Sequence, residues 1–268
     1  MSKEVLHAGP KKGMPAAHST GEAKGVDAIG HKGLGGKLLS PRGTGLWVIA
    51  IATFVVLIAL DWSGMDQKVS SLAFVGGEWK WKDWGLWKFL YDYGPVPSIL
   101  VGVGSLVWGI VLLVRKAPRK KWLWALYPFA CLAIAPGLLV NALGKDQWGR
   151  PRPRDCEVFG GQQHYQHFWS PHFGGEGRSF PSGHASVGFY LCCLSMIPGN
   201  RRRWLWLGIG LLMGVLIGMA RIAQGGHFIT DIVASCGIVL FVSWMLAPSF
   251  CWLGQKGGTG HNARPANS

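Results

Sequence analysis

Residues 46–62 read LWVIAIATFVVLIALDW, and the first fifteen of them carry no charged side chain. An apolar stretch of this length can cross the ~30 Å hydrocarbon core of a bilayer as an α-helix. Five later runs have similar length and composition, and they cover residues 95–114, 122–143, 183–198, 204–220 and 231–253. A soluble protein would need unusually long buried helices to account for them. The pattern therefore predicts an all-α polytopic membrane protein with about six transmembrane helices.

The segments outside these runs are polar. Residues 1–45 are rich in Gly, Lys and His and contain little that could form a core, so they predict a disordered basic N-terminal tail. Residues 46–253 make up the predicted six-helix membrane domain, and residues 254–268 a short polar C-terminal tail. Pro128 and Pro136 lie inside the third run and predict kinks in its helix.

The charge distribution predicts an orientation. A net charge of +14 would suit a nucleic-acid-binding protein, but the basic residues lie in short connections beside the apolar runs. Residues 115–121 hold five basic side chains and residues 201–203 are three arginines. Such clusters favour the cytoplasmic side, where they meet anionic lipid. We therefore expect both termini in the cytoplasm and no nucleic-acid partner.

The opposite side then holds residues 61–94, 144–181 and 221–230. The connection 144–181 has five basic side chains against four acidic ones, which the orientation rule does not explain but a phosphate site would. Residues 79–87 contain four tryptophans. The simpler interpretation of these tryptophans is an interfacial helix anchored in the head-group region, and the alternative is a lateral gate that guides a lipid toward a site.

Ionisable residues stand at the ends of four predicted helices, all on this outer side. Lys145 follows the third run, His184 opens the fourth, Arg221 closes the fifth and Asp231 opens the sixth, with His227 in the turn before it. Ionisable groups near a bilayer are costly and are usually functional. Their gathering at one face predicts a single site.

The residue types suit a phosphate ligand. Lys145, Arg152 and Arg221 would supply positive charge, with arginine able to donate two parallel hydrogen bonds to phosphate oxygens. The prolines in the RPRPR segment at 150–154 keep the preceding arginines extended. Ser182 and Gly183 directly precede an apolar helix, where backbone N–H groups and the Ser182 hydroxyl can bind an anion.

Two histidines and a carboxylate supply the reactive groups. His227 and Asp231 are four residues apart, so on a helical turn they would face the same way. A carboxylate bonded to one imidazole nitrogen leaves the other free to attack phosphorus. His184 can then protonate the leaving alkoxide. Phosphoryl transfer depends mainly on positioning and charge stabilisation, so this set needs no metal or other cofactor.

These residues resemble the motifs of the type 2 phosphatidic acid phosphatase family, which shares its site with vanadium haloperoxidases and bacterial acid phosphatases. The family pattern is Lys, six residues and Arg-Pro; then Pro-Ser-Gly-His; then Ser-Arg, five residues, His, three residues and Asp. The matching positions here are Lys145, Arg152, Pro153, residues 181–184, Arg221, His227 and Asp231. One position departs from the pattern, because Ala220 stands where the family has serine. We expect a small loss of polar support there and the same mechanism.

The resemblance covers residues 46–250 and implies a role for each matching residue. By it, His227 is the nucleophile of a phospho-histidine intermediate, Asp231 orients it and His184 is the general acid. The implied phosphate-binding residues are Lys145, Arg152, Ser182, Gly183 and Arg221. Membrane members of the family have six helices with the site at the outer face, so the implied location is the bacterial inner membrane with the site facing the periplasm.

The connection between the first two motifs bears on the substrate, which we expect to be a phosphorylated membrane lipid. Its aromatic and histidine-rich stretch at 159–172, with Arg150 and Arg154 as candidate head-group contacts, suggests a head group larger or more anionic than phosphatidic acid. The chain is similar to bacterial lipid A, phosphatidylglycerophosphate and undecaprenyl diphosphate phosphatases, and we favour lipid A or a related phospholipid. A metal site from His164, His167 and His172 lacks a carboxylate or cysteine at suitable spacing and is not expected.

Three other functions remain open from the sequence. A phosphotransferase would pass the phosphoryl group to an acceptor other than water. A haloperoxidase shares the residues but is usually soluble. A lipid-binding or transport protein without catalysis would place ionisable groups along a path through the membrane, whereas here they gather at one face.

Overall fold

The computed structural model describes residues 44–145 and 147–255. The predicted tails fall outside this part of the chain, except that residues 44–45 begin the first helix and residues 254–255 end the last one. The described elements are helices apart from one two-stranded hairpin. The chain is an all-α polytopic membrane protein, as the hydropathy pattern predicts.

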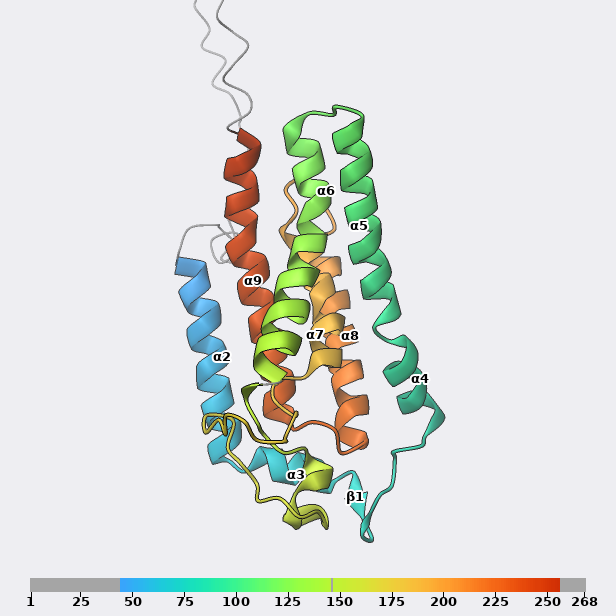
Figure 1. The fold of residues 1–268 in the computed structure, drawn as a ribbon, viewed down its shortest axis with the longest axis vertical. Helices are drawn as coiled ribbons and strands as arrows, with labels where there is room; N and C mark the ends of the chain where they lie inside the picture. The colour runs from blue at the N-terminus through green and yellow to red at the C-terminus, as the bar shows by residue number, and fades with distance from the viewer. Residues whose placement is uncertain (1–43, 146, 256–268) are drawn as a thin grey trace, which may run out of the picture. The chain divides into compact units, whose positions relative to one another are not determined.

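The long helices follow the apolar runs closely (Figure 1). They are α2 (Thr44–Trp62), α5 (Val96–Val114), α6 (Arg119–Leu132), α8 (Arg203–Ala223) and α9 (Ile229–Gln255). A shorter helix, α4 (Gly85–Tyr93), leads into α5, and α6 continues into the π-helix η1 (Ala133–Lys145). In the described residues, five helical stretches are long and apolar enough to cross a membrane. One of them consists of α4 with α5, and another of α6 with η1.

The fourth predicted run differs from the expectation. Residues 183–198 form two short helices, α7 (Gly183–Phe189) and the 3-10 helix η4 (Tyr190–Met196), of seven residues each. Both pack against α8 and α9, α7 also packs against η1 and η4 against α6, and most of their side chains are buried. Because protein surrounds this segment, its apolar residues fill the core and need not present a membrane-length surface to lipid.

A close helix crossing sets the position of α7. A Cβ atom on Gly214 of α8 would overlap with the ring of Phe189, and one on Gly188 would lie 2.8 Å from the Cα atom of Gly214. Glycine at both positions therefore lets α7 and α8 approach each other. The buried residues Ala185 and Phe189 join this contact to the core formed with α9.

The third predicted helix changes its geometry where kinks are expected. The α-helical hydrogen bonding of α6, which contains Pro128, gives way to the wider π-helix η1, which contains Pro136. The side-chain amide of Asn141 donates to the carbonyl of Pro136 at 2.7 Å, so a side chain supports the backbone near the proline. η1 ends at Lys145, the first predicted phosphate ligand.

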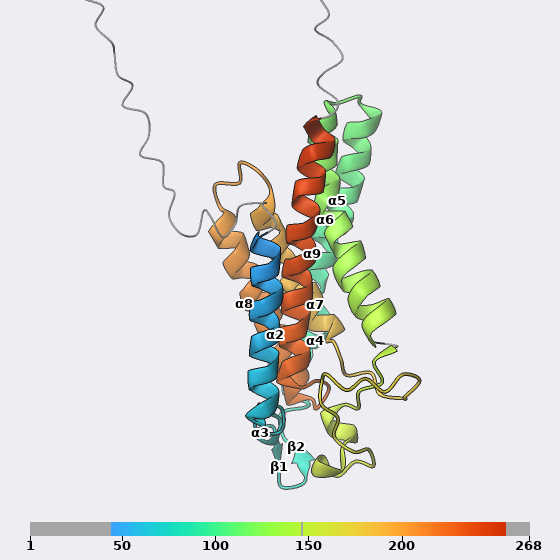
Figure 2. The same cartoon turned by 90° about the vertical axis from the view of Figure 1, so that its left-hand side faces the viewer.

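The short elements and connections gather at one end of the helices (Figures 1 and 2). They include α3 (Met65–Ser71), the hairpin strands β1 (Phe74–Val75) and β2 (Glu78–Trp79), α4, and the connection after η1 with the 3-10 turns η2 (Pro153–Asp155) and η3 (Glu157–Phe159). Of the two interpretations of the Trp-rich segment, the interfacial helix over 79–87 differs from the structure, which has a strand end, a turn and the start of α4 at Gly85.

Candidate active site

One cavity of about 420 Å³ brings together six of the predicted site residues. They come from η1, the RPRPR segment, α7, α8 and the turn before α9, and they are Lys145, Arg152, Arg154, His184, Arg221 and His227. The remaining wall comes from the segment around α4 and from the end of α8, with Trp79, Lys82, Asp83, Lys88, Tyr91, Asp92 and Gln224. The imidazoles of His184 and His227 therefore line the same cavity, although they lie 43 positions apart in the chain.

The ring of His227 is held through its Nδ1 atom. This atom lies 2.6 Å from the backbone carbonyl oxygen of Ser179. A carbonyl oxygen only accepts hydrogen bonds, so Nδ1 carries the proton and Nε2 of the neutral ring has a free lone pair. Burial lowers the pKa of His227 below its ordinary value; Asp231 opposes this lowering and Arg221 adds to it. The arrangement favours a neutral imidazole with Nε2 available as a nucleophile.

Asp231 lies behind this histidine and does not line the cavity. Its Oδ2 atom is 3.5 Å from Nδ1 of His227, further than the Ser179 carbonyl. The same oxygen accepts a hydrogen bond from the Ser179 hydroxyl at 2.5 Å and one from the Phe228 N–H at 2.8 Å. The two predicted partners therefore lie within ion-pair distance, although His227 precedes α9, which begins at Ile229. Asp231 also holds Ser179, whose carbonyl holds His227.

Arg150 is the predicted head-group contact that the structure contradicts. Its side chain is fully buried, donating to Asp231 at 2.5 Å, Asp66 at 2.7 Å and the hydroxyl of Thr230 at 2.8 Å. Burial alone would lower the pKa of this guanidinium, but the carboxylates of Asp231 and Asp66 raise it above its ordinary value. A buried cation needs buried carboxylates, and Asp66 lies 84 positions earlier in the chain, so sequence spacing alone did not reveal the pair.

Asp66 and Thr230 are site-supporting residues that the sequence did not single out. Asp66 also accepts hydrogen bonds from the backbone N–H of Thr230 at 3.0 Å and from its hydroxyl at 2.7 Å. These contacts fasten α3 to the start of α9. In the sequence, the only indication of this role is that Asp66 is an acidic residue between two apolar runs on the predicted outer side.

Tyr91 is another residue that the sequence did not identify. Its ring stacks on the imidazole of His184, with centroids 4.7 Å apart and planes inclined by 19°. The guanidinium carbon of Arg221 lies 4.6 Å from the centroid of the same tyrosine ring. Arg221 also donates to the side chain of Gln224 at 2.5 Å. Tyr91 therefore fixes the planes of the predicted general acid and one predicted phosphate ligand.

The cavity has a strong positive charge. Its wall contains six Lys or Arg side chains and two carboxylates, Asp83 and Asp92. The buried Nε atoms of Arg152 and Arg221 have no hydrogen-bond partner within the described residues. Burial lowers the pKa of Arg152, and nearby Arg154 adds to this, although an arginine side chain stays protonated in proteins. Such a concentration of donors suits a phosphate group.

Ser182 and Gly183 stand beside the cavity and not in its wall. The Ser182 hydroxyl caps α7 by accepting from the Ala185 N–H at 3.5 Å. A Cβ atom on Gly183 would overlap with the side-chain amide of Asn141, so glycine lets η1 approach α7. Their phosphate contacts remain predictions. Ala220, the departure from the family pattern, is fully buried.

Two of the three histidines of the long connection bind separate carboxylates. Nδ1 of His167 lies 2.8 Å from Asp61, and Nδ1 of His164 lies 2.8 Å from Glu157. The described residues contain no cluster of three His, Cys, Asp or Glu side chains arranged to hold a metal ion.

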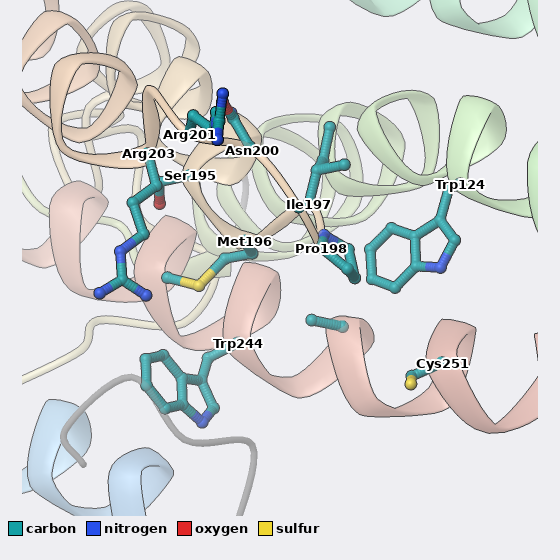
Figure 3. A pocket seen from close by; sticks show the side chains of 12 residues that line it. Trp124, Ser195, Met196, Ile197, Pro198, Asn200, Arg201, Arg203, Trp244 and Cys251 are labelled. Atoms are coloured by element: carbon teal, nitrogen blue, oxygen red, sulfur yellow. The ribbon is translucent and has the colours of Figure 1, made fainter. Parts of the chain in front are cut away.

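A larger cavity of about 480 Å³ contains none of the predicted site residues (Figure 3). Its wall includes Trp124, Met196 and Trp244, with Arg201 and Arg203 on one side. Volume therefore does not identify the site in this protein. The smaller cavity combines two histidines with six cations, and that chemistry makes it the candidate active site.

Comparison with known proteins supports this assignment. Residues 124–253 match the model of the PAP2 superfamily. The chain is 40% identical over 200 residues to a lipid A 4'-phosphatase of Francisella tularensis subsp. novicida, which covers 72% of this chain and 87% of that protein. This chain belongs to the PAP2 superfamily.

A second relative in the superfamily, a lipid A 4'-phosphatase of Rhizobium leguminosarum, is 35% identical over 106 residues, covering 38% of this chain and 44% of that protein. No solved structure matches the chain. The relatives, together with the apolar helices, identify a multi-pass membrane protein that is a lipid phosphatase. The predicted family and enzyme class are confirmed.

Proposed function

We propose that this PAP2 protein removes a phosphate from lipid A, or from a closely related phosphorylated lipid, through a phospho-histidine intermediate. The observation that carries the proposal is the shared cavity of His227 and His184, with Nδ1 of His227 on a backbone carbonyl. This leaves one imidazole to attack and a second to move a proton.

The residues suggest a two-step reaction. Lys145, Arg152 and Arg221 hold the phosphate oxygens while Nε2 of His227 attacks phosphorus. The bond to the lipid oxygen breaks, and that oxygen takes a proton from His184. In the second step His184 accepts a proton from water, whose oxygen attacks the phospho-histidine. Inorganic phosphate leaves and His227 returns to its starting form.

The relatives' names support lipid A as the substrate, since both are lipid A 4'-phosphatases. The rest of the cavity wall agrees, because Arg154 and the lysines around α4 line the same cavity as the three proposed phosphate ligands and can meet additional anionic groups. Arg150 is not part of this selection, because it is buried behind the site.

We also propose that the cavity faces the periplasm from the inner membrane, with both termini in the cytoplasm. The clusters at 115–121 and 201–203 support this orientation, because they lie in turns and first helical residues at the helix ends away from the site. Lipid A in the outer leaflet would then present its phosphate to the cavity directly.

The test is phosphate release from lipid A by the purified protein in detergent, with EDTA present. We expect release by the wild type, a fall of at least about a thousandfold for His227→Asn, and labelled enzyme when the turnover of phosphorus-32 substrate is stopped early. Loss of activity on chelation, or full activity of His227→Asn, would contradict the mechanism. Appearance of the label on another lipid in place of free phosphate would identify a phosphotransferase.

A further inference from the structure

A second cavity of about 360 Å³ shares a wall with the candidate active site. Every side chain that lines it is apolar. They are Trp81, Trp84 and Trp87 from the segment around α4, Met219, Ile222 and Ala223 from the end of α8, and three residues in and just after α3. Its size lies in the ~300–1,000 Å³ range of ligand pockets. We refer to it as the tryptophan pocket.

The wall between the two cavities has two chemically different faces. Around α4, residues that neighbour each other in the chain point to opposite sides. Trp81, Trp84 and Trp87 line the tryptophan pocket, whereas Lys82, Asp83 and Lys88 line the active-site cavity. The end of α8 divides in the same way, since Ile222 and Ala223 face the tryptophan pocket and Arg221 and Gln224 face the active site.

The three tryptophans form a continuous surface. The rings of Trp84 and Trp87 meet edge to face with centroids 5.3 Å apart, and those of Trp81 and Trp84 do so at 6.2 Å. Trp84 keeps 49% of its surface exposed and Leu72, at the end of α3, keeps 74%, so the rim of the pocket is open. A lining with no ionisable side chain, whose polar side-chain groups are the indole N–H groups of the tryptophans, fits a hydrocarbon chain.

We propose that the tryptophan pocket binds an acyl chain of the lipid whose phosphate occupies the neighbouring cavity. This inference rests on the proposed function. It assigns a binding site to the acyl part of the substrate, which the phosphate-binding residues do not contact. A molecule with a phosphate and an attached acyl chain matches two adjoining cavities of which one has six cations and the other only apolar side chains. Simple membrane anchoring by the tryptophans would not require the pocket to adjoin the phosphate site.

The first experiment compares lipid A with its fully deacylated, doubly phosphorylated disaccharide in the same detergent. Trp84→Ala removes the central ring of the wall, and Met219→Trp narrows the pocket from α8, where Met219 is 47% exposed and has room for a larger side chain. Removing the contacts of several methylene groups should lower kcat/KM for lipid A about tenfold, with the value for the deacylated compound unchanged.

The matched control is Trp62→Ala. Trp62 ends α2, is 80% exposed and does not line the pocket, so its loss tests membrane anchoring alone. We expect the ratio of kcat/KM for the two substrates to stay at the wild-type value. A ratio that is also unchanged in Trp84→Ala and Met219→Trp would overturn the proposal.

A second measurement covers the case in which the deacylated compound is not turned over. Lipid A carrying a photoreactive group on an acyl chain is cross-linked to the wild-type protein, and the labelled peptides are mapped. Label within residues 69–87 or 219–223 that excess lipid A displaces supports the proposal. Label found only elsewhere, or label that excess phospholipid displaces and lipid A does not, overturns it.

The two proposals fail in different ways. If the wild type releases no phosphate from lipid A, the proposed function fails. If the wild type is active and His227→Asn is not, but the pocket variants leave the substrate ratio and the cross-linking unchanged, only the acyl-chain inference fails.

Discussion

The Nδ1 atom of His227 faces a backbone carbonyl, and the nearest carboxylate is a second neighbour. Asp231, 3.5 Å from Nδ1, favours the protonated imidazole, whereas burial and the charge of Arg221 favour the neutral form. The carbonyl fixes the tautomer without adding a full negative charge. Asp231 also holds Ser179. At the scale of single residues, the site therefore favours a neutral ring.

The titration of His227 tests this interpretation. Burial lowers the pKa of its imidazole, so the neutral form should persist below pH ~6.5, the midpoint of an unperturbed histidine. With the histidine rings labelled with nitrogen-15, the NMR signal that is lost in His227→Asn should titrate with a midpoint below that value. A midpoint at or above it would contradict the assignment.

Arg150 offers a second test at this scale. Arg150→Met would leave the carboxylates of Asp66 and Asp231 buried without their cation, a change that typically costs about 3–5 kcal/mol. We expect a clear fall in the thermal unfolding midpoint in detergent. The control is Arg154→Met, whose side chain is 45% exposed and lies 3.8 Å from Asp155, and whose loss should cost under ~1 kcal/mol. Equal effects of the two variants would argue against a structural role for Arg150.

At the scale of helices, the site depends on how closely α7 approaches its neighbours. His184 lies in the first turn of α7, and its position follows from the glycine contacts with α8 and with Asn141 of η1. Tyr91 of α4 then stacks on the same ring. Helices that are far apart in the chain therefore converge on one imidazole, and a shift of any one would move it.

Alanine substitutions at Gly214 and Gly208, both on α8, test whether the close approach of α7 and α8 requires glycine. A methyl group at Gly214 would overlap with the Phe189 ring, whereas one at Gly208 would meet nothing within 4 Å. Gly214→Ala should destabilise the protein by roughly 1–3 kcal/mol through overpacking. Gly208→Ala should be neutral or stabilising by up to about 1 kcal/mol. Thermal unfolding followed by circular dichroism separates the two, and equal midpoints would contradict the crossing.

At the scale of the whole described chain, the helices set the position of the site relative to the bilayer. The short elements and the cavity-lining connections lie at one end of the helices, and the turn at 115–118 lies away from it (Figure 1). Charged loops seldom cross a membrane once they are placed. The proposed orientation can therefore be tested by asking which end of the helices a reagent outside the inner membrane can reach.

Cysteines introduced at the two ends test the orientation. Gln162→Cys, in the connection beside the site, should react with a membrane-impermeant maleimide in cells whose outer membrane alone is permeabilised. Lys116→Cys, in the turn between α5 and α6, should react only after the inner membrane is opened. Cys131, Cys156, Cys192 and Cys193 are buried, so background labelling from these four should be low. The reverse pattern would place the cavity in the cytoplasm.

The sequence by itself determined the membrane class, the positions of the long helices and six of the residues that line the candidate active site. Apolar runs identify helices because a bilayer offers no water to satisfy an exposed backbone, and the motif spacing names the family's reactive groups. Only the tertiary structure separated Arg150 from Arg154, which the sequence offers alike as head-group contacts. Arg150 is buried because Asp66 and Asp231, which are far apart in the chain, meet it in the fold. The stacking of Tyr91 on His184 and the carbonyl that holds His227 likewise depend on contacts between residues distant in the chain.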